Sequence, residues 1–236
     1  STDSLSISDN YTNNIKAFEL YMRGKFELKE DKEVRDTKEI LESAVDNMAL
    51  ILKHDKEFSI IYKDLAFIHL FLGHDDEMKE CLEKTMELLH KFPEPLQYEI
   101  KSNYFLFVEK NHKKRIKLYE LWTTLQPHNI IARKELASAY FQEGDSGKAL
   151  EQLLIIFDMT PSDFNILSDI VDVYIAKNNF EDAKKILKDF GAKYPNNYKA
   201  YSKLGELYES MGEFKKAKEQ YEIVSLIEPN INDITL

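Results

Sequence analysis

Six histidines and a single cysteine are the side chains of this 236-residue chain with which metal or nucleophilic chemistry would begin. No HExxH pair and no Cys/His spacing typical of a metal site occurs. His69 and His74 stand beside a short acidic run, but their five-residue spacing puts the two imidazoles on different faces of a helix. This favours a solvated helix end over a metal site. Cys81 has no nucleophile motif around it and occupies an apolar position, which is typical of a small core residue.

Motifs for phosphate chemistry and acid–base catalysis are also missing from the sequence. Neither a GxxxxGK[ST] nor a GxGxxG loop occurs. Asp169 and Asp172 are spaced as neighbours on a polar helix face, which is a simpler interpretation than a general acid/base pair. The sequence therefore predicts no enzyme, with no catalytic residues, no metal ligands and no cofactor.

The charge balance argues against nucleic acid as a partner. Lys and Arg total 32 and Asp and Glu total 42, a formal net charge of −10, whereas nucleic-acid binding needs a surplus of cations. Residues 96–129 are the one basic stretch, with six basic and three acidic residues, a net charge of +3. We call its centre the basic island: Lys110, Lys113, Lys114, Arg115 and Lys117. It could contact an acidic partner or nucleic acid, but a solvated turn between helices is favoured, because one turn supplies too few charges.

Composition indicates a helix-prone globular chain. Hydrophobic residues make up 43% of it, whereas Gly and Pro number only seven and six. No apolar run approaches the roughly 18 residues that a membrane span requires. One cysteine fits a cytoplasmic protein, and a periplasmic location or a place within a longer chain beginning before Ser1 stays open.

A 34-residue period is the strongest signal in the sequence. Four of the six prolines share one phase, and three further positions repeat at the same step. The members are Pro127, Pro161, Pro195 and Pro229; Ala149, Ala183 and Ala217; Tyr140, Tyr174 and Tyr208; and Leu136, Ile170 and Leu204.

The last copy shows what one unit is. Residues 201–208 carry apolar side chains at three- and four-residue steps, as one face of a helix does. Gly212 can end that helix in a left-handed conformation, residues 214–224 form a second amphipathic helix, and Pro229 stops it. Small residues at Gly205 and Ala217 would let the two helices approach closely. In the fifth copy Asn178 replaces the turn glycine and tolerates the same conformation.

The pattern Tyr201-x2-Leu204-Gly205-x2-Tyr208…Gly212…Ala217-x3-Tyr221…Pro229 resembles a tetratricopeptide repeat (TPR). This resemblance implies an all-α fold, a right-handed α-solenoid of about six helix-turn-helix units and about twelve helices. A polar linker, residues 1–16, would precede the array, and a tail, residues 232–236, would follow it. The expected repeats cover 17–231 and are 17–58, 59–95, 96–129, 130–163, 164–197 and 198–231.

Resemblance to TPR proteins also implies a function: a non-catalytic scaffold that holds a segment of another protein on the first helices of its repeats. The expected partner-groove residues lie on those first helices: Tyr21, Lys25, Lys63, Phe67, Lys101, Tyr104, Lys134, Ser138 and Phe141. Aromatic groups with scattered lysines suit a partner with apolar anchors and acidic character, whereas the acidic last two repeats would prefer basic residues. Phe18, Phe71 and Phe107 could instead pack between helices.

Two further expectations concern the ends of the array. The segment Ala17–Gly24 resembles repeat regions behind bacterial signalling modules (cyclases, kinases and transcription regulators), so a regulatory or docking role in a larger protein is the alternative function. Apolar residues of the last helix, including Leu226, would stay uncovered unless Ile231, Ile234 and Leu236 fold back onto it. Otherwise that end is a surface for homo-oligomerisation.

Overall fold

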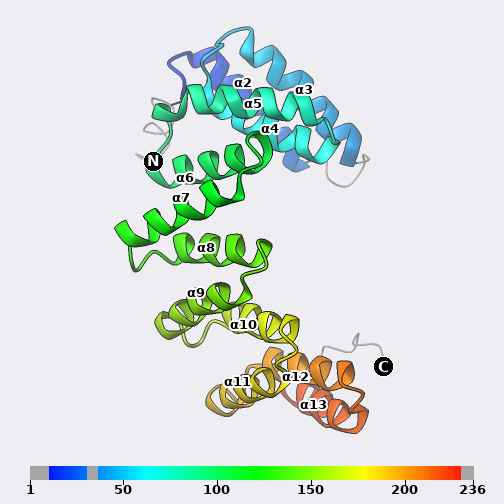
Figure 1. Ribbon diagram of the computed structural model, residues 1–236. Helices are drawn as coiled ribbons and strands as arrows, with labels where there is room; N and C mark the ends of the chain where they lie inside the picture. The colour runs from blue at the N-terminus through cyan, green and yellow to red at the C-terminus, as the bar shows by residue number, and fades with distance from the viewer. Residues whose placement is uncertain (1–10, 31–36, 230–236) are drawn as a thin grey trace. The chain divides into compact units, whose positions relative to one another are not determined.

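The computed structural model describes the backbone of residues 11–30 and 37–229, and these residues fold into helices with no strand among them (Figure 1). The all-α prediction is confirmed. The chain divides into two compact units, Ser1–Leu118 and Tyr119–Leu236.

The N-terminal unit consists of helices that pack in chain order. Neighbours α2 and α3, α3 and α4, and α4 and α5 are in contact, and α5 packs on α6 and on the turn that follows it. The elements are α2 (Ile15–Glu30), α3 (Thr37–Leu52), α4 (Ser59–Leu72), α5 (Asp75–Glu87), the 3-10 turn η2 (Leu89–Lys91), α6 (Glu94–Asn103), the π-helical turn η3 (Tyr104–Val108) and the first part of α7 (His112–Leu125).

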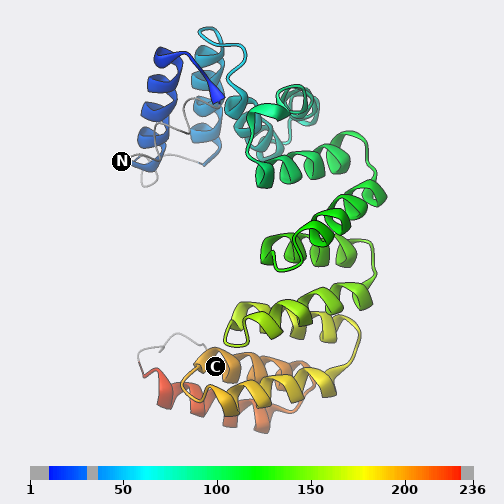
Figure 2. The same ribbon diagram turned by 90° about the vertical axis from the view of Figure 1, so that its left-hand side faces the viewer.

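The C-terminal unit consists of the rest of α7 and six further helices of nearly equal length. Each of α8 to α12 packs on the next helix (Figure 2, green to red). The helices are α8 (Ile130–Gln142), α9 (Ser146–Met159), α10 (Phe164–Ala176), α11 (Phe180–Lys193), α12 (Tyr198–Ser210) and α13 (Phe214–Ile227).

The turns between paired helices explain why glycine or asparagine recurs at one position of the 34-residue period. Gly144, Asn178 and Gly212 have φ angles of 81°, 55° and 74°, and each lies in the turn that follows the first helix of a pair. A left-handed residue reverses the chain there, and glycine does so at no steric cost. The prediction that Asn178 keeps this conformation is confirmed.

The residues that cap the helix starts in the C-terminal unit also recur with the 34-residue period, which was not predicted from the sequence. The side chains of Asn129 and Asp163 accept hydrogen bonds from backbone N–H groups at the starts of α8 and α10. Asp145 and Asn179 do the same for α9 and α11. Both pairs are 34 residues apart. Such N-caps satisfy N–H groups that have no partner within the helix, which fixes where each helix begins.

The core of the C-terminal unit is built from apolar residues that the period places on facing helices. Leu167, Val171, Leu187 and Leu204 are buried in one cluster. A Cβ at Gly205 would lie 2.5 Å from Cε1 of Tyr221 on the paired helix, so glycine is required for this contact. The prediction that Gly205 permits close helix packing is confirmed, with Tyr221 as its neighbour.

The third predicted repeat departs from this regularity. Arg115 occupies the place where other copies have alanine, and it is buried, with its Nε donating to Ser102 Oγ at 3.0 Å. The chain before it includes the π-helical turn η3, whose Glu109 N–H donates to the carbonyl of Tyr104 at 3.1 Å. Lys110 then adopts a left-handed φ of 51°. A long polar side chain is thus held inside the unit by a hydrogen bond rather than by small-residue packing.

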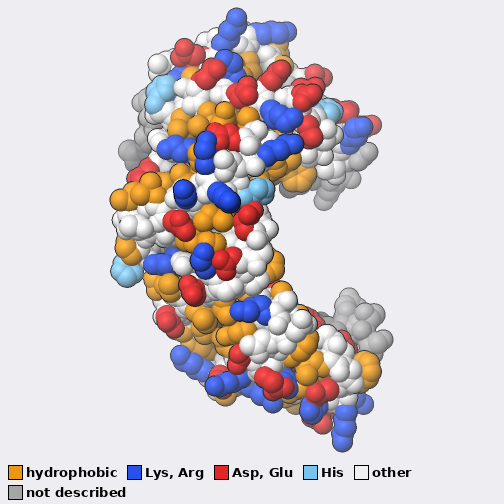
Figure 3. Space-filling model, in the orientation of Figure 1, with side chains coloured by type: hydrophobic (Ala, Val, Ile, Leu, Met, Phe, Trp, Pro, Cys, Tyr) orange, Lys and Arg blue, Asp and Glu red, His pale blue; other side chains and the backbone are white. Residues whose placement is uncertain are grey.

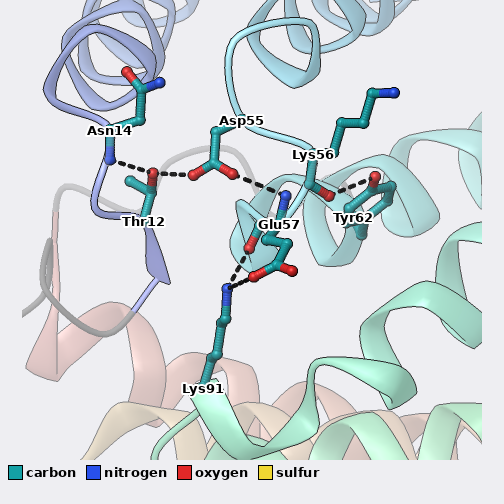
Figure 4. A network of polar contacts seen from close by, with 7 residues as sticks. All are labelled: Thr12, Asn14, Asp55, Lys56, Glu57, Tyr62 and Lys91. Atoms are coloured by element: carbon teal, nitrogen blue, oxygen red, sulfur yellow. Dashed lines mark hydrogen bonds and ion pairs between the residues drawn. The ribbon is translucent and has the colours of Figure 1, made fainter.

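A polar network ties the first described residues to the N-terminal unit (Figure 4). Thr12 is buried and its hydroxyl donates to Asp55. Lys91 Nζ donates to the carbonyl of Glu57 at 2.9 Å and to its carboxylate at 3.1 Å. Lys91 belongs to the turn η2, which connects α5 to α6. This connection, and part of the stretch predicted as a linker, therefore contact the α3–α4 turn.

A membrane crossing needs a long, apolar helix, and the described parts of the chain contain no helix that meets both conditions.

Candidate functional site

Tyr21 lies in the core of the N-terminal unit and not on an open surface. Its side chain is buried, its ring meets Phe58 edge-on, and its hydroxyl donates to Asp64 Oδ2 at 2.9 Å. Burial, followed by the charge of Asp64, raises the pKa of Tyr21. The structure thus assigns Tyr21 a packing role, which corrects the expectation that it lines a groove. The side chain of Lys25, which was expected beside it, lies outside the described residues.

Lys63 and Phe67 on α4 line a small cavity of about 50 Å³ together with residues of α5, α6 and η3. Lys63 Nζ lies 3.4 Å from Glu99 Oε1, so its charge is already partnered. Phe67 is 62% exposed and Phe71 is 66% exposed, and their ring centroids are 4.8 Å apart. The spacing of four residues puts the two rings on one helix face, where they form an exposed aromatic pair.

The other aromatic residues expected on this face contribute to packing. Tyr104 and Phe107 pack against the buried cluster that contains Ala66, Met78 and Leu82. Phe107 also lines the small cavity, whereas Phe18 packs against the core formed by α2, α3 and α4. Lys101 is half-buried, with its Nζ 6.0 Å from the ring centre of Tyr98. The pair of Phe67 and Phe71 therefore differs from its aromatic neighbours in being exposed.

In the C-terminal unit the structure brings together all three residues that were expected on α8. Lys134, Ser138 and Phe141 are exposed and lie on one side of that helix. They line a groove of about 360 Å³, which we call the α8–α10 groove. Its other lining residues come from α8, from α9 and from α10: Glu135, Ala137, Ala149, Leu153, Asp169, Asp172 and Val173.

The floor and the rim of the α8–α10 groove differ in character. Ala137, Ala149, Leu153 and Val173 are all buried and offer apolar surface. Sequence reasoning missed the residues from α9, because it considered only the first helix of each repeat. The period was the available signal, since Ala149 is one of its small positions. A small residue there leaves the space that opens between α8 and α10.

Charged groups around the rim are mostly acidic. Asp172 Oδ1 lies 2.9 Å from Lys203 Nζ, and Glu135 accepts a hydrogen bond from the Tyr119 hydroxyl at 3.3 Å. Burial raises the pKa of Asp169, and the positive charge of Lys134 partly opposes this shift. Charged side chains of both signs stand among hydrophobic ones over the visible surface (Figure 3). The groove can thus offer an apolar contact and an ionic contact to the same ligand.

The basic island does not form one patch of equivalent cations. Lys114 Nζ pairs with Glu109 Oε2 at 2.6 Å and lies 5.6 Å from the ring centre of Phe105. Arg115 is buried against Ser102, as described above, and so is removed from any contact surface. The four lysines of the island are exposed, but only Lys110 lies in the turn, whereas Lys113, Lys114 and Lys117 lie on α7 itself. The island is therefore the solvated start of a helix rather than the expected turn between helices.

His69 and His74 are in contact, contrary to the expectation that their spacing separates them. Their Nδ1 atoms are 3.3 Å apart, because Gly73, with a φ of 74°, ends α4 and turns the chain back between them. Burial, followed by the proximity of His74, lowers the pKa of His69. In the described part of the chain, no group of three or more His, Cys, Asp or Glu side chains is arranged to hold a metal ion.

Cys81 is half-buried and packs against the same apolar cluster as Tyr104. Burial raises the pKa of its thiol to about 11, which disfavours the nucleophilic thiolate near neutral pH. This agrees with the interpretation of Cys81 as a core residue.

Similarity to known proteins is found in both the sequence and the structure. Residues 174–233 match the family model described as tetratricopeptide repeat. The TPR repeat protein oca3 of Schizosaccharomyces pombe is 22% identical over 159 residues, which are 66% of this chain and 54% of oca3. The chain therefore spans about half the length of this curated relative.

Solved structures show the same fold at low sequence identity. The nearly identical TPR-like repeats of a putative kinesin light chain from Podosopora anserina match with a TM-score of 0.55 and 18% identity, over 73% of this chain and 95% of that one. MamA from Desulfovibrio magneticus RS-1 matches with a TM-score of 0.50 and 15% identity, over 74% and 97%. The class defined by these helix pairs is the TPR solenoid, and this chain is similar to tetratricopeptide repeat proteins in part of its sequence as well as in its fold.

Proposed function

We propose that this chain is a non-catalytic scaffold that binds a segment of a partner protein on the first helices of its repeats. The α8–α10 groove carries this proposal. It presents the exposed side chains of Lys134, Ser138 and Phe141 above an apolar floor, in a volume of about 360 Å³. Pockets that hold small ligands or side chains span roughly 300–1,000 Å³, so the space suits an anchoring group of a partner.

The exposed aromatic pair of the N-terminal unit supports the same function. Phe67 and Phe71 expose large apolar surface on α4, the first helix of a predicted repeat. Aromatic residues that stay exposed together are typical of surfaces that contact other proteins. The two surfaces lie in different units, and each is proposed as a contact in its own right.

Capture of partners by the native chain tests the proposal. Phe67→Ala and Phe141→Ala should each reduce the amount of a captured partner, because truncating an exposed aromatic anchor commonly costs about 1–3 kcal/mol of binding energy. Phe214→Ala is the matched control, since Phe214 is 70% exposed but lies on the second helix of its pair. A partner lost with the first two variants and kept with the control supports the proposal. Equal retention by all variants would contradict it.

A regulatory role within a larger signalling protein remains the alternative prediction, and no structural observation favours it. Ala17 and Tyr21, two of the residues that suggested it, are buried in the core of the N-terminal unit, and packing explains them. The full-length reading frame would decide between these functions. The cytoplasmic location also stays a prediction.

A further inference from the structure

The floor of the α8–α10 groove is apolar. Ala137, Ala149, Leu153 and Val173 are between 1% and 6% exposed, and none of these side chains carries a polar atom. Phe141, at the edge, is 44% exposed. A polar group placed on this floor would lose its hydrogen bonds to water without finding new ones, whereas an aliphatic or aromatic group would gain from leaving water. The base therefore selects an apolar side chain.

The charged side chains that line the groove determine which charge the ligand should carry. Three carboxylates, Glu135, Asp169 and Asp172, and one ammonium group, Lys134, line the groove, a formal sum of −2. Two of the carboxylates have partners, because Glu135 accepts from Tyr119 and Asp172 pairs with Lys203.

Asp169 differs from these two carboxylates. Within residues 11–30 and 37–229 its side chain makes no hydrogen bond and no ion pair, and Lys134 is near enough to affect its pKa without a direct contact. An approaching cation would therefore pair with Asp169 without displacing an existing partner. An approaching carboxylate would meet repulsion from Asp169 and Asp172, opposed by the attraction of Lys134 and of Lys203, which is already paired with Asp172.

We propose that the α8–α10 groove binds a partner segment that presents a lysine or arginine beside an apolar side chain, with the apolar group on the floor and the cation paired with Asp169. This inference rests on the proposed function and specifies its ligand. The spacing of Asp169 and Asp172 on α10 places both carboxylates on one face of the helix, so the preference for a cation extends along that rim. The positive charges of Lys134 and Lys203 limit this preference and restrict where along the rim the cation of the partner can bind.

Four labelled peptides of equal length, titrated into the full chain and followed by fluorescence anisotropy, test this ligand class. Their sequences alternate leucine with arginine, leucine with glutamate, serine with arginine, and leucine with serine. The Leu–Arg peptide should bind about tenfold more tightly than each of the others, a difference of about 1.4 kcal/mol.

Asp169→Asn should weaken the binding of only the two arginine peptides, by about three- to tenfold. Phe141→Ala should weaken every peptide that contains leucine.

Matched controls use residues outside the groove. Asp158→Asn removes an exposed carboxylate from α9, and Phe214→Ala removes an exposed ring from α13, so neither should change the affinity for the Leu–Arg peptide. Lys134→Gln should strengthen it. All of these side chains are exposed, and circular dichroism would check that each variant keeps its helices.

Each contrary result has a separate meaning. Preferred binding of the Leu–Glu peptide, or an unchanged Leu–Arg affinity in Asp169→Asn, would overturn the proposed cation. A Ser–Arg affinity equal to that of Leu–Arg would overturn the apolar contact. If Phe141→Ala still weakens binding in these cases, the groove keeps its role and only the ligand class fails. If Phe141→Ala changes no affinity, or instead abolishes self-association of the chain, the groove is not the peptide site and the proposed function fails with it.

Discussion

Gly205 shows how one residue can set the distance between two helices. It lies on α12 where the ring of Tyr221 from α13 crosses it, and the closest ring atom would be 2.5 Å from an added Cβ. Tyr221 is only half-buried, yet burial and a hydrogen bond to Glu209 raise the pKa of its hydroxyl to about 12. The ring packs against Gly205 and its hydroxyl is hydrogen-bonded to Glu209, so a methyl group at position 205 requires the ring to shift.

We therefore expect Gly205→Ala to lower the free energy of unfolding by about 1–3 kcal/mol, because the added methyl overpacks the α12–α13 contact. Chemical denaturation followed by circular dichroism measures the change.

Gly147→Ala is the matched control for this substitution. A Cβ at Gly147, inside α9, would come no nearer than 3.6 Å to another heavy atom, the Oδ1 of Asp145. Alanine should thus stabilise this helix by up to about 1 kcal/mol. Equal effects of the two substitutions would show that the ring of Tyr221 does not constrain position 205.

At the scale of the elements, N-caps distinguish helices that otherwise look equivalent. Asp163 and Asn197 are one period apart and both precede the first helix of a pair. The Asp163 side chain accepts a hydrogen bond from the Asn165 N–H at 2.9 Å, whereas Asn197 makes no side-chain cap bond to α12. A residue type that is suited to capping is therefore not sufficient for a cap to form.

Asp163→Ala should cost about 1 kcal/mol of stability, because an N–H group at the start of α10 loses its partner. Asn197→Ala should cost only a few tenths of a kcal/mol, since α12 has no such bond to lose. Denaturation midpoints of the two variants, measured side by side, check this difference. Equal losses would mean that the helix start is stabilised by something other than the side-chain cap.

At the scale of the whole chain, stability should be distributed locally. Most contacts between helices join neighbours in sequence, both in the N-terminal and in the C-terminal unit, and α10 also contacts α12. In such an array the free energy is approximately a sum of repeat terms and nearest-neighbour terms. A destabilising substitution in one unit should therefore leave the backbone amides of distant helices protected from hydrogen exchange.

Leu65→Ala and Leu204→Ala test this locality as a matched pair, because both remove a buried leucine from the first helix of a predicted repeat. Each substitution should lower the free energy of unfolding of the helices around it by about 2–5 kcal/mol. Hydrogen exchange followed by mass spectrometry should show lost protection in α4 and α5 for the first variant and in α12 and α13 for the second. Loss of protection along the entire chain with either variant would contradict the local picture.

The surface of the last helix is a further feature at this scale. Val224 is buried, whereas Leu226 is 81% exposed on α13. The residues expected to cover it, Ile231, Ile234 and Leu236, lie outside the described residues. Self-association through this end stays a prediction from the sequence.

In the regular part of the chain, from α8 onwards, periodicity alone was enough to predict the helix pairs, the turns within them and the exposed face of α8. A 34-residue repeat places the same residue type at the same point of each helix pair, so Gly144, Asn178 and Gly212 could be assigned to one turn conformation. Lys134, Ser138 and Phe141 could be assigned to one open face for the same reason, because α8 begins the most regular part of the chain.

Only the tertiary structure decided the contacts between elements. Tyr21 and Arg115 are buried because Asp64 and Ser102 lie where they can accept hydrogen bonds, and helical spacing cannot reveal those partners. His69 and His74 meet because the chain reverses between them. The floor of the α8–α10 groove includes Leu153 from α9, since a cavity is bounded by whatever packs behind it. Spacing fixes the face of a helix on which a side chain lies, and packing fixes what that face touches.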